Sequence, residues 1–184
     1  MELQRQESEK QNKLLLALSS VTFALLQYIW QFTHPVSALQ LLSEMQASSL
    51  SVTVVGHNNK PSVVDFWAPW CENCKASAPT LRVVEREYAS RVNFILVNAD
   101  DANSWPLIEA FGVDAIPHLA LVSADGNVET ALIGLVPASV LKSDLNTMLD
   151  NAAIANPTEQ KSLPYTMYDA FRLRPEKRHI SFEE

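Results

Sequence analysis

The chain holds two cysteines, Cys71 and Cys74, and only two residues separate them in the sequence. Two cysteines rule out a fold held by several disulfide bridges, and they rule out a metal ribbon with four thiolate ligands. The chain must therefore fold around an apolar core, which is feasible because 47% of its 184 residues are hydrophobic and 19% are charged. The cysteines are then a redox pair, half of a mixed-ligand metal site, or two unrelated thiols.

The chain is acidic, with a formal net charge of −7 at pH 7. This argues against binding to nucleic acid, which needs a basic surface to neutralise phosphates. Residues 51–150 carry six Lys or Arg and twelve Asp or Glu, so their balance of −6 supplies nearly all of the acidity. The length allows one domain of roughly 100 to 150 residues with appendages.

Residues 14–33 contain no charged side chain. As a helix, such a segment rises about 30 Å, the thickness of the hydrocarbon core of a bilayer. A buried helix of a soluble protein would show a polar stripe, which the polar residues of this segment do not form. The apolar part of a signal peptide is usually shorter than this segment. The small residues Val36 and Ala38 leave cleavage after Ala38 open. We expect a retained transmembrane anchor over 14–33.

The orientation of this anchor follows from its flanks. Three basic residues precede the span, and no Lys or Arg follows it until Lys60. The positive-inside rule then places residues 1–13 on the cytoplasmic or stromal side and exports everything after about residue 34.

The remaining sequence alternates between strand-like and helical patterns. Residues 34–50 predict a linker with a short amphipathic helix, and 151–184 form a C-terminal extension. Between them, a domain over 51–150 is predicted to be of the α/β class, with a central sheet covered on both faces. The dipeptide Asp125-Gly126 predicts a hairpin. The expected strands are 51–55, 62–67, 92–98, 118–123 and 128–134.

Two helical patterns separate these strands, and a third follows the last strand. The residues after Cys74 place Ala78, Leu81, Val84 and Tyr88 on one face. Ser104 is a candidate cap for a short helix that ends by Gly112, and Pro137 is a candidate start for the last one. The expected buried face of that last helix is Leu141, Leu145 and Met148.

The cysteine pair lies between the strand over 62–67 and a helix. At such a turn the first cysteine falls at or near the helix N-cap, where the macrodipole and free N–H groups favour a thiolate. Cys71 is therefore the expected nucleophile. Cys74, one turn into the helix, is expected to be more buried and to resolve the mixed disulfide that Cys71 forms.

Residues 64–75, VDFWAPWCENCK, resemble the active-site segment of thioredoxins. Pro79 stands where thioredoxins kink the following helix, residues 112–117 resemble the loop that carries the family's cis-proline, and Gly134 matches the glycine that ends its last strand. The resemblance implies a thioredoxin-like fold, a central mixed sheet flanked by helices, here preceded by one transmembrane helix. It implies no cofactor other than the Cys71–Cys74 disulfide, and no metal.

The resemblance also assigns roles to particular residues. Asp65 holds the position of a buried carboxylate that relays a proton to or from the resolving thiol, and a raised pKa suits that role. A solvent-facing Asp at a strand edge is the alternative. Pro117, cis by resemblance, leaves the backbone of Ile116 free to pair with an extended substrate. Trp70 is expected in the groove wall and Trp67 in the core.

Three residues depart from the thioredoxin pattern. Glu72 and Asn73 replace the family's Gly-Pro spacer, which is expected to tune the reduction potential in a direction that the sequence does not fix. His118 follows the cis-proline where Thr is common. It is a candidate for tuning Cys71 or for a third metal ligand, and a hydrogen-bonded structural histidine is the alternative.

The Glu-Asn spacer, the Ile-Pro-His sequence, the anchor and the segment 162–165 resemble a narrower group, the membrane-anchored thioredoxin-like proteins of thylakoids (TxlA type). The resemblance implies a thylakoid location with the redox domain in the lumen, or the plasma membrane and periplasm as second choice. It implies disulfide substrates such as apocytochromes, a transmembrane thiol carrier of the CcdA type as electron source, and a role in assembling a cytochrome or photosynthetic complex. An oxidant or isomerase, and a scaffold that uses the groove to hold a partner, remain alternatives.

The extension over 151–184 has three prolines and no sustained periodicity. We expect a loosely ordered segment. A basic cluster near its end is read as a solvated charge run, with contact to lipid headgroups or to a partner as the alternative. The cluster is Arg172, Arg174, Lys177 and Arg178.

Overall fold

The computed structural model describes residues 13, 15–28, 37–154, 157–166 and 168–170. It divides into two compact units, Met1–Ser37 and Ala38–Glu184. In the first unit, residues 15–28 are helical and their side chains are exposed. None of the described helices has both the length and the apolar character needed to span a membrane. The predicted anchor over 14–33 extends beyond this helix, since Leu14 and residues 29–33 lie outside the described residues.

The second unit is built on one five-stranded mixed sheet in the order β2-β1-β3-β4-β5. β1 pairs with β2 in parallel and with β3 antiparallel, and β4 pairs antiparallel with β3 and in parallel with β5. The hairpin predicted at Asp125-Gly126 is confirmed, with Gly126 at φ +92°. The strands are β1 (Ser62–Trp67), β2 (Asn93–Asn98), β3 (His118–Val122), β4 (Val128–Ile133) and β5 (Tyr168–Asp169).

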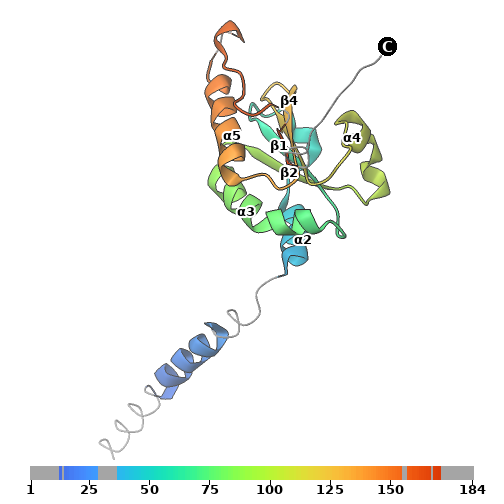
Figure 1. Ribbon diagram of the computed structural model, residues 1–184. Coiled ribbons are helices and arrows are strands. Elements are labelled where there is room, and N and C mark those ends of the chain that lie inside the picture. Colours follow the sequence, from blue (N-terminus) through green and yellow to red (C-terminus); the bar gives the residue numbers. More distant parts are fainter. Residues whose placement is uncertain (1–12, 14, 29–36, 155–156, 167, 171–184) are drawn as a thin grey trace, which may run out of the picture. The chain divides into compact units, whose positions relative to one another are not determined.

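Helices cover both faces of this sheet, as predicted. α3 and α5 lie on one side and α4 on the other (Figure 1). α2 joins the α3 and α5 side, and the short 3-10 helix η1 joins the α4 side. The helices are α2 (Ala38–Ser48), η1 (Val52–Val54), α3 (Glu72–Tyr88), η2 (Ala102–Ser104), α4 (Trp105–Ala110), α5 (Ala138–Ala152) and η3 (Pro157–Glu159).

The predicted faces of the longer helices are the buried ones. On α3 the four residues expected to share a face are all buried, together with Cys74. On α5 the three expected residues are buried, together with Val140 and Asp144. Each stripe packs on the sheet because residues three and four apart lie on the same side of a helix. Ser104 is the N-cap residue of α4, but its side chain makes no cap hydrogen bond.

The strand predicted over 51–55 is wrong. These residues form the 3-10 helix η1, in which the side chain of Ser51 accepts a hydrogen bond from the N–H of Thr53. Valines predict strands because they fit a pleated surface. Here Val52 and Val54 instead pack from outside against the apolar core on the α4 side. Just before η1, Leu50 N–H donates a backbone hydrogen bond to Phe94 O of β2 (3.4 Å).

The described part of the C-terminal extension is more ordered than predicted. Residues 161–166 return along α5, and residues 168–169 form β5 beside β4. Asp144 Oδ1 of α5 accepts a hydrogen bond from the N–H of Tyr165 (3.0 Å), and Leu163 is buried in the core. We call residues 161–166 and 168–170 the strap. Its strand depends on β4 as a neighbour, so local periodicity does not reveal it. The basic cluster lies outside the described residues.

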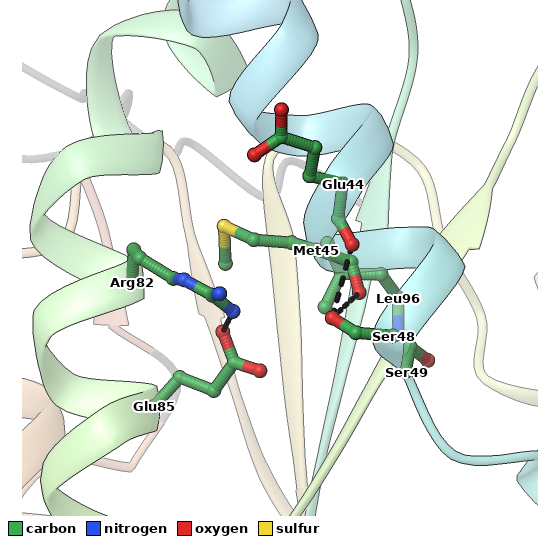
Figure 2. A network of polar contacts seen from close by, with 7 residues as sticks. All are labelled: Glu44, Met45, Ser48, Ser49, Arg82, Glu85 and Leu96. Atoms are coloured by element: carbon green, nitrogen blue, oxygen red, sulfur yellow. Dashed lines mark hydrogen bonds and ion pairs between the residues drawn. The ribbon is translucent and has the colours of Figure 1, made fainter. Parts of the chain in front are cut away.

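α2 is confirmed as an amphipathic helix, and it is attached to the domain by packing and by its C-terminal end. Leu42 and Met45 are fully buried, and Figure 2 shows Met45 projecting from α2 toward α3. Ser48 donates to two carbonyls of the last turn, and Ser49 Oγ accepts a hydrogen bond from Leu96 N–H on β2 (2.9 Å). The end of α2 therefore covers an edge strand that would otherwise expose backbone groups.

Candidate active site

Cys71 and Cys74 form a disulfide with their Cα atoms 5.3 Å apart. Cys71 is the N-cap residue of α3, with extended backbone, and its Sγ accepts a hydrogen bond from the N–H of Cys74 (3.1 Å). Cys71 is 5% exposed and Cys74 1% exposed, so the predicted order of burial is confirmed. A reduced Cys71 sulfur at this position faces the positive end of the helix dipole, which stabilises a thiolate.

Asp65 is buried in β1, an inner strand between β2 and β3. The alternative of a solvent-facing Asp at a strand edge is excluded by this position. Val63 and Trp67, two residues away on either side, belong to the core that contains both cysteines. Because side chains alternate along a strand, Asp65 points to the same face as that core. Burial raises the pKa of Asp65 to about 7, which suits a proton acceptor near neutral pH.

The two tryptophans of the active-site segment have different surroundings, as predicted. Trp67 is 3% exposed in the core, and its indole N–H donates to Gln46 Oε1 on α2 (2.8 Å). Trp70 is 64% exposed, and its indole N–H donates to Asp100 Oδ1 after β2 (3.2 Å). The sequence contains no signal for Gln46 or Asp100, because both partners are distant in the chain and meet the tryptophans only through the fold.

A groove lies beside Trp70 with a volume of about 320 Å³. Its other walls come from the segment after β2, from Ile108 of α4 and from the loop before β3, which includes Asp114 and Ile116. The Ile116–Pro117 peptide bond is cis, as the resemblance implied. Ile116 borders the groove next to the exposed Trp70, an arrangement that can hold an extended peptide.

The residues between the cysteines face different environments. Glu72 is exposed, and its carboxylate forms an ion pair with Lys75 Nζ (2.8 Å) one turn along α3. Asn73 is half-buried. The Lys75 ammonium partly offsets the charge that Glu72 places beside Cys71, although pairs this exposed are weak.

His118 lies on the other face of the sheet from the cysteine core. Its ring packs edge-on against Phe66 at 5.8 Å between ring centroids, and Phe66 belongs to the core on the α4 side. The histidine is 2% exposed. Because its ring faces away from the cysteines, any effect of His118 on Cys71 would have to be transmitted across strand β3. Among the described residues, no three His, Cys, Asp or Glu side chains are placed to hold a metal ion.

Comparison with known proteins matches this chain to thioredoxins and thioredoxin-like proteins. The family model described as Thioredoxin matches residues 44–147. The chloroplastic thioredoxin-like protein HCF164 of Arabidopsis thaliana is 36% identical over 107 residues, which are 58% of this chain and 41% of that protein. A TxlA homolog of Synechocystis, a thiol:disulfide interchange protein, is 30% identical over 152 residues, covering 81% of this chain and 83% of the relative. Thioredoxin of Pyropia yezoensis is 39% identical over 57% of this chain and 94% of its own length.

The coverage differs between these relatives. The chain spans about two fifths of the length of the chloroplastic proteins from Arabidopsis thaliana and Oryza sativa, at 41% and 37%. The match to the Synechocystis protein, by contrast, includes most of both chains.

Proposed function

Because the chain belongs to the thioredoxin family, we propose that it is a thiol–disulfide oxidoreductase of the TxlA type that reduces disulfides of other proteins. The observation that carries the proposal is the disulfide between Cys71 at the N-cap of α3 and Cys74 inside it, directly after Trp70, which lines a groove. The named thiol:disulfide interchange relatives support it.

The proposed cycle starts from the reduced pair. The Cys71 thiolate attacks one sulfur of a target disulfide, which forms a mixed disulfide and releases the first target thiolate. Asp65 then accepts the proton of Cys74, directly or through a water molecule. The Cys74 thiolate attacks Cys71 Sγ, and the second target thiolate leaves and takes up a proton. Two electrons have passed to the target, and the Cys71–Cys74 disulfide is regenerated.

The groove orients the target for this attack. A target segment that pairs with the backbone of Ile116 would pass between Trp70 and the loop before Pro117. Asp100 holds the Trp70 indole through its hydrogen bond, so that wall is fixed before the target arrives. An ordered wall lowers the entropy cost of binding an extended peptide.

The setting of the proposal is a membrane. We propose that residues 14–33 anchor the chain in the thylakoid membrane, or the plasma membrane as second choice, with the redox domain in the lumen or periplasm. The uncharged span and its basic N-terminal flank support this, as do the relatives named chloroplastic and TxlA. Electrons would come from a transmembrane thiol carrier of the CcdA type, and apocytochromes would be among the targets, in support of cytochrome or photosynthetic complex assembly.

Trapping of the mixed disulfide tests the proposal. In the full chain, Cys74→Ser should leave Cys71 able to attack but unable to be released, so covalent adducts with target proteins accumulate. They should disappear on addition of dithiothreitol, and mass spectrometry identifies the targets. The matched control is Cys71→Ser, which removes the expected nucleophile and should give no adducts. Equal adduct formation by both variants, or none by either, would contradict the assigned roles.

A further inference from the structure

Trp105, the first residue of α4, has a large apolar side chain that the proposed cycle does not use. It is 65% exposed, about as much as Trp70 at 64%. Single exposed apolar residues are ordinary on a protein surface, so exposure alone assigns Trp105 no role. Its position on α4 is the reason to assign one, because the same helix supplies a wall of the groove beside Trp70. We call that groove the redox groove.

α4 (Trp105–Ala110) borders two grooves with different residues (Figure 1). Ile108 lines the redox groove, whereas Leu107 lines a separate groove along β2. Each helical residue is rotated about 100° from the one before it, so Trp105 lies about 60° from Ile108 and about 160° from Leu107 around the helix axis. Residues three apart on a helix are also neighbours, with Cβ atoms about 5 to 6 Å apart. Trp105 therefore stands next to Ile108, on the side of the redox groove.

The segment that joins the two exposed tryptophans is held by hydrogen bonds. Asp100 accepts the indole N–H of Trp70 (3.2 Å), and the side chain of the next residue, Asp101, caps η2. η2 leads directly into Trp105, and Pro106 in the first turn of α4 restricts the backbone there. Both tryptophans therefore belong to an ordered part of the fold, and little entropy is lost when a target segment binds against them.

We propose that Trp105 is a specificity-determining residue of the redox groove, which contacts a large apolar side chain of the target near its reactive cysteine. The inference rests on the proposed function and names the class of target segment that the groove takes. Six of the seven residues that line the groove have apolar side chains, and the seventh is Asp114. A tryptophan beside this lining adds a large flat surface for an aliphatic or aromatic side chain, and anchors of this kind dominate binding energies.

The rate at which the reduced full chain attacks short disulfide peptides tests the inference. Each probe is a peptide of alanine and serine whose central cysteine carries a coloured aryl thiol as a mixed disulfide. Cys71 attacks the peptide sulfur, a bond between Cys71 and the peptide forms, and the aryl thiolate leaves, so the colour measures the second-order rate constant. One leucine is placed in turn at each position on either side of the cysteine, and the leucine-free peptide is the reference.

The variants are Trp105→Ala and the conservative Trp105→Phe. The control is Val83→Ala, because Val83 is 61% exposed on α3 and does not line the redox groove. In the wild type, leucine at one position should raise the rate constant about tenfold over the reference peptide. Trp105→Ala should reduce this preference to about twofold or less, whereas Trp105→Phe keeps most of it and the control keeps all of it.

Fluorine resonance of chains labelled with 5-fluorotryptophan tests the contact directly. In Cys74→Ser the adduct between Cys71 and a peptide persists, and the Trp105 signal is identified by its loss in Trp105→Phe. This signal should differ between the adduct with the preferred leucine peptide and the adduct with the reference peptide.

Three results would overturn the inference and leave the proposed function in place. They are a wild-type chain that reduces the peptides with no leucine preference, a preference that Trp105→Ala retains or loses only through an equal slowing of every peptide, and a Trp105 signal that does not respond to the leucine. A wild-type chain that reduces none of the peptides would contradict the proposed function, and the inference with it.

Discussion

Asp65 is a carboxyl group in an inner strand of the sheet, and its burial makes the stability of the domain depend on pH. Burial raises its pKa from 3.8 to about 7 in the folded protein. The folded state therefore binds this proton more tightly than the unfolded state does. The contribution of Asp65 to the free energy of unfolding is largest below about pH 4. It falls as the pH rises toward 7 and levels off above that value. A shift of about three units corresponds to a loss of about 4 kcal/mol as an upper limit.

Asp65→Asn should remove this loss. We expect the free energy of unfolding of the oxidised variant to change much less between pH 4 and pH 7 than that of the wild type, because the amide does not titrate. Guanidinium unfolding at a series of pH values measures it. The matched control is Glu109→Gln, since Glu109 is exposed on α4, and it should keep the wild-type slope. An unchanged slope in Asp65→Asn would mean that the carboxyl titrates alike in both states.

At the scale of single residues, the redox site was largely predictable from the sequence. Cys71 at a helix start and Asp65 in a buried strand follow from local patterns and from motif spacing. Gln46 and Asp100, which hold the two tryptophans, did not follow. Their hydrogen bonds join segments that only the complete sheet brings together, and no periodicity marks such a partner.

Among the elements, α2 is held to the domain chiefly by buried side chains that face α3. Met45 is 0% exposed and projects between the two helices (Figure 2). Met45→Ala should therefore lower the free energy of unfolding by about 2 to 5 kcal/mol, because it removes buried contacts and leaves a cavity. The control on the same helix is Leu39→Ala, since Leu39 is 39% exposed, and it should cost less than about 1 kcal/mol. Equal losses in chemical unfolding would show that α2 does not pack as described.

The strap is the element that the sequence did not predict, and a buried carboxylate contributes one of the contacts that hold it. Asp144 Oδ1 accepts the Tyr165 N–H, while burial raises the pKa of Asp144 to about 6. Asp144→Asn retains an oxygen acceptor at this position, whereas Asp144→Leu removes it. We expect the Tyr165 amide to stay protected from hydrogen exchange in the Asn variant and to lose protection in the Leu variant. Loss of protection in both variants would mean that the charge of Asp144, and not its acceptor geometry, secures the strap.

The predictions that failed for whole elements share a physical cause. The valines of 51–55 have strand propensity, but in and after η1 they pack on the outside of the apolar core on the α4 side. The strand β5 is two residues long and exists only as a neighbour of β4. In both cases tertiary packing decides the backbone conformation, and intrinsic propensity is a weak guide when packing decides. The long helices α3 and α5 were predictable because each buries a full stripe of apolar residues.

For the whole molecule, the proposed location outside the cytoplasm sets a requirement on the electron supply. Each turnover of a disulfide reductase consumes two electrons, and in a compartment that favours disulfides the reduced pair must be regenerated. A membrane anchor would keep the redox domain close to a carrier that brings electrons across the bilayer. The span over 14–33 and the pair at Cys71 and Cys74 then belong to one functional unit.

Charged residues placed within the uncharged span test this requirement in the full chain. Leu18→Lys together with Leu25→Lys should move the protein from the alkali-resistant membrane fraction to the soluble fraction, because a lysine near the centre of a span, as at position 25, opposes insertion by about 3 kcal/mol and one nearer its end adds a smaller cost. The control pair, Leu18→Ile with Leu25→Ile, should remain in the membrane. In intact cells or vesicles, a membrane-impermeant thiol reagent should label reduced Cys71 of the wild type only from the lumenal or periplasmic side. Membrane retention of the lysine variant, or labelling from the cytoplasmic or stromal side, would contradict the proposed anchor and its orientation.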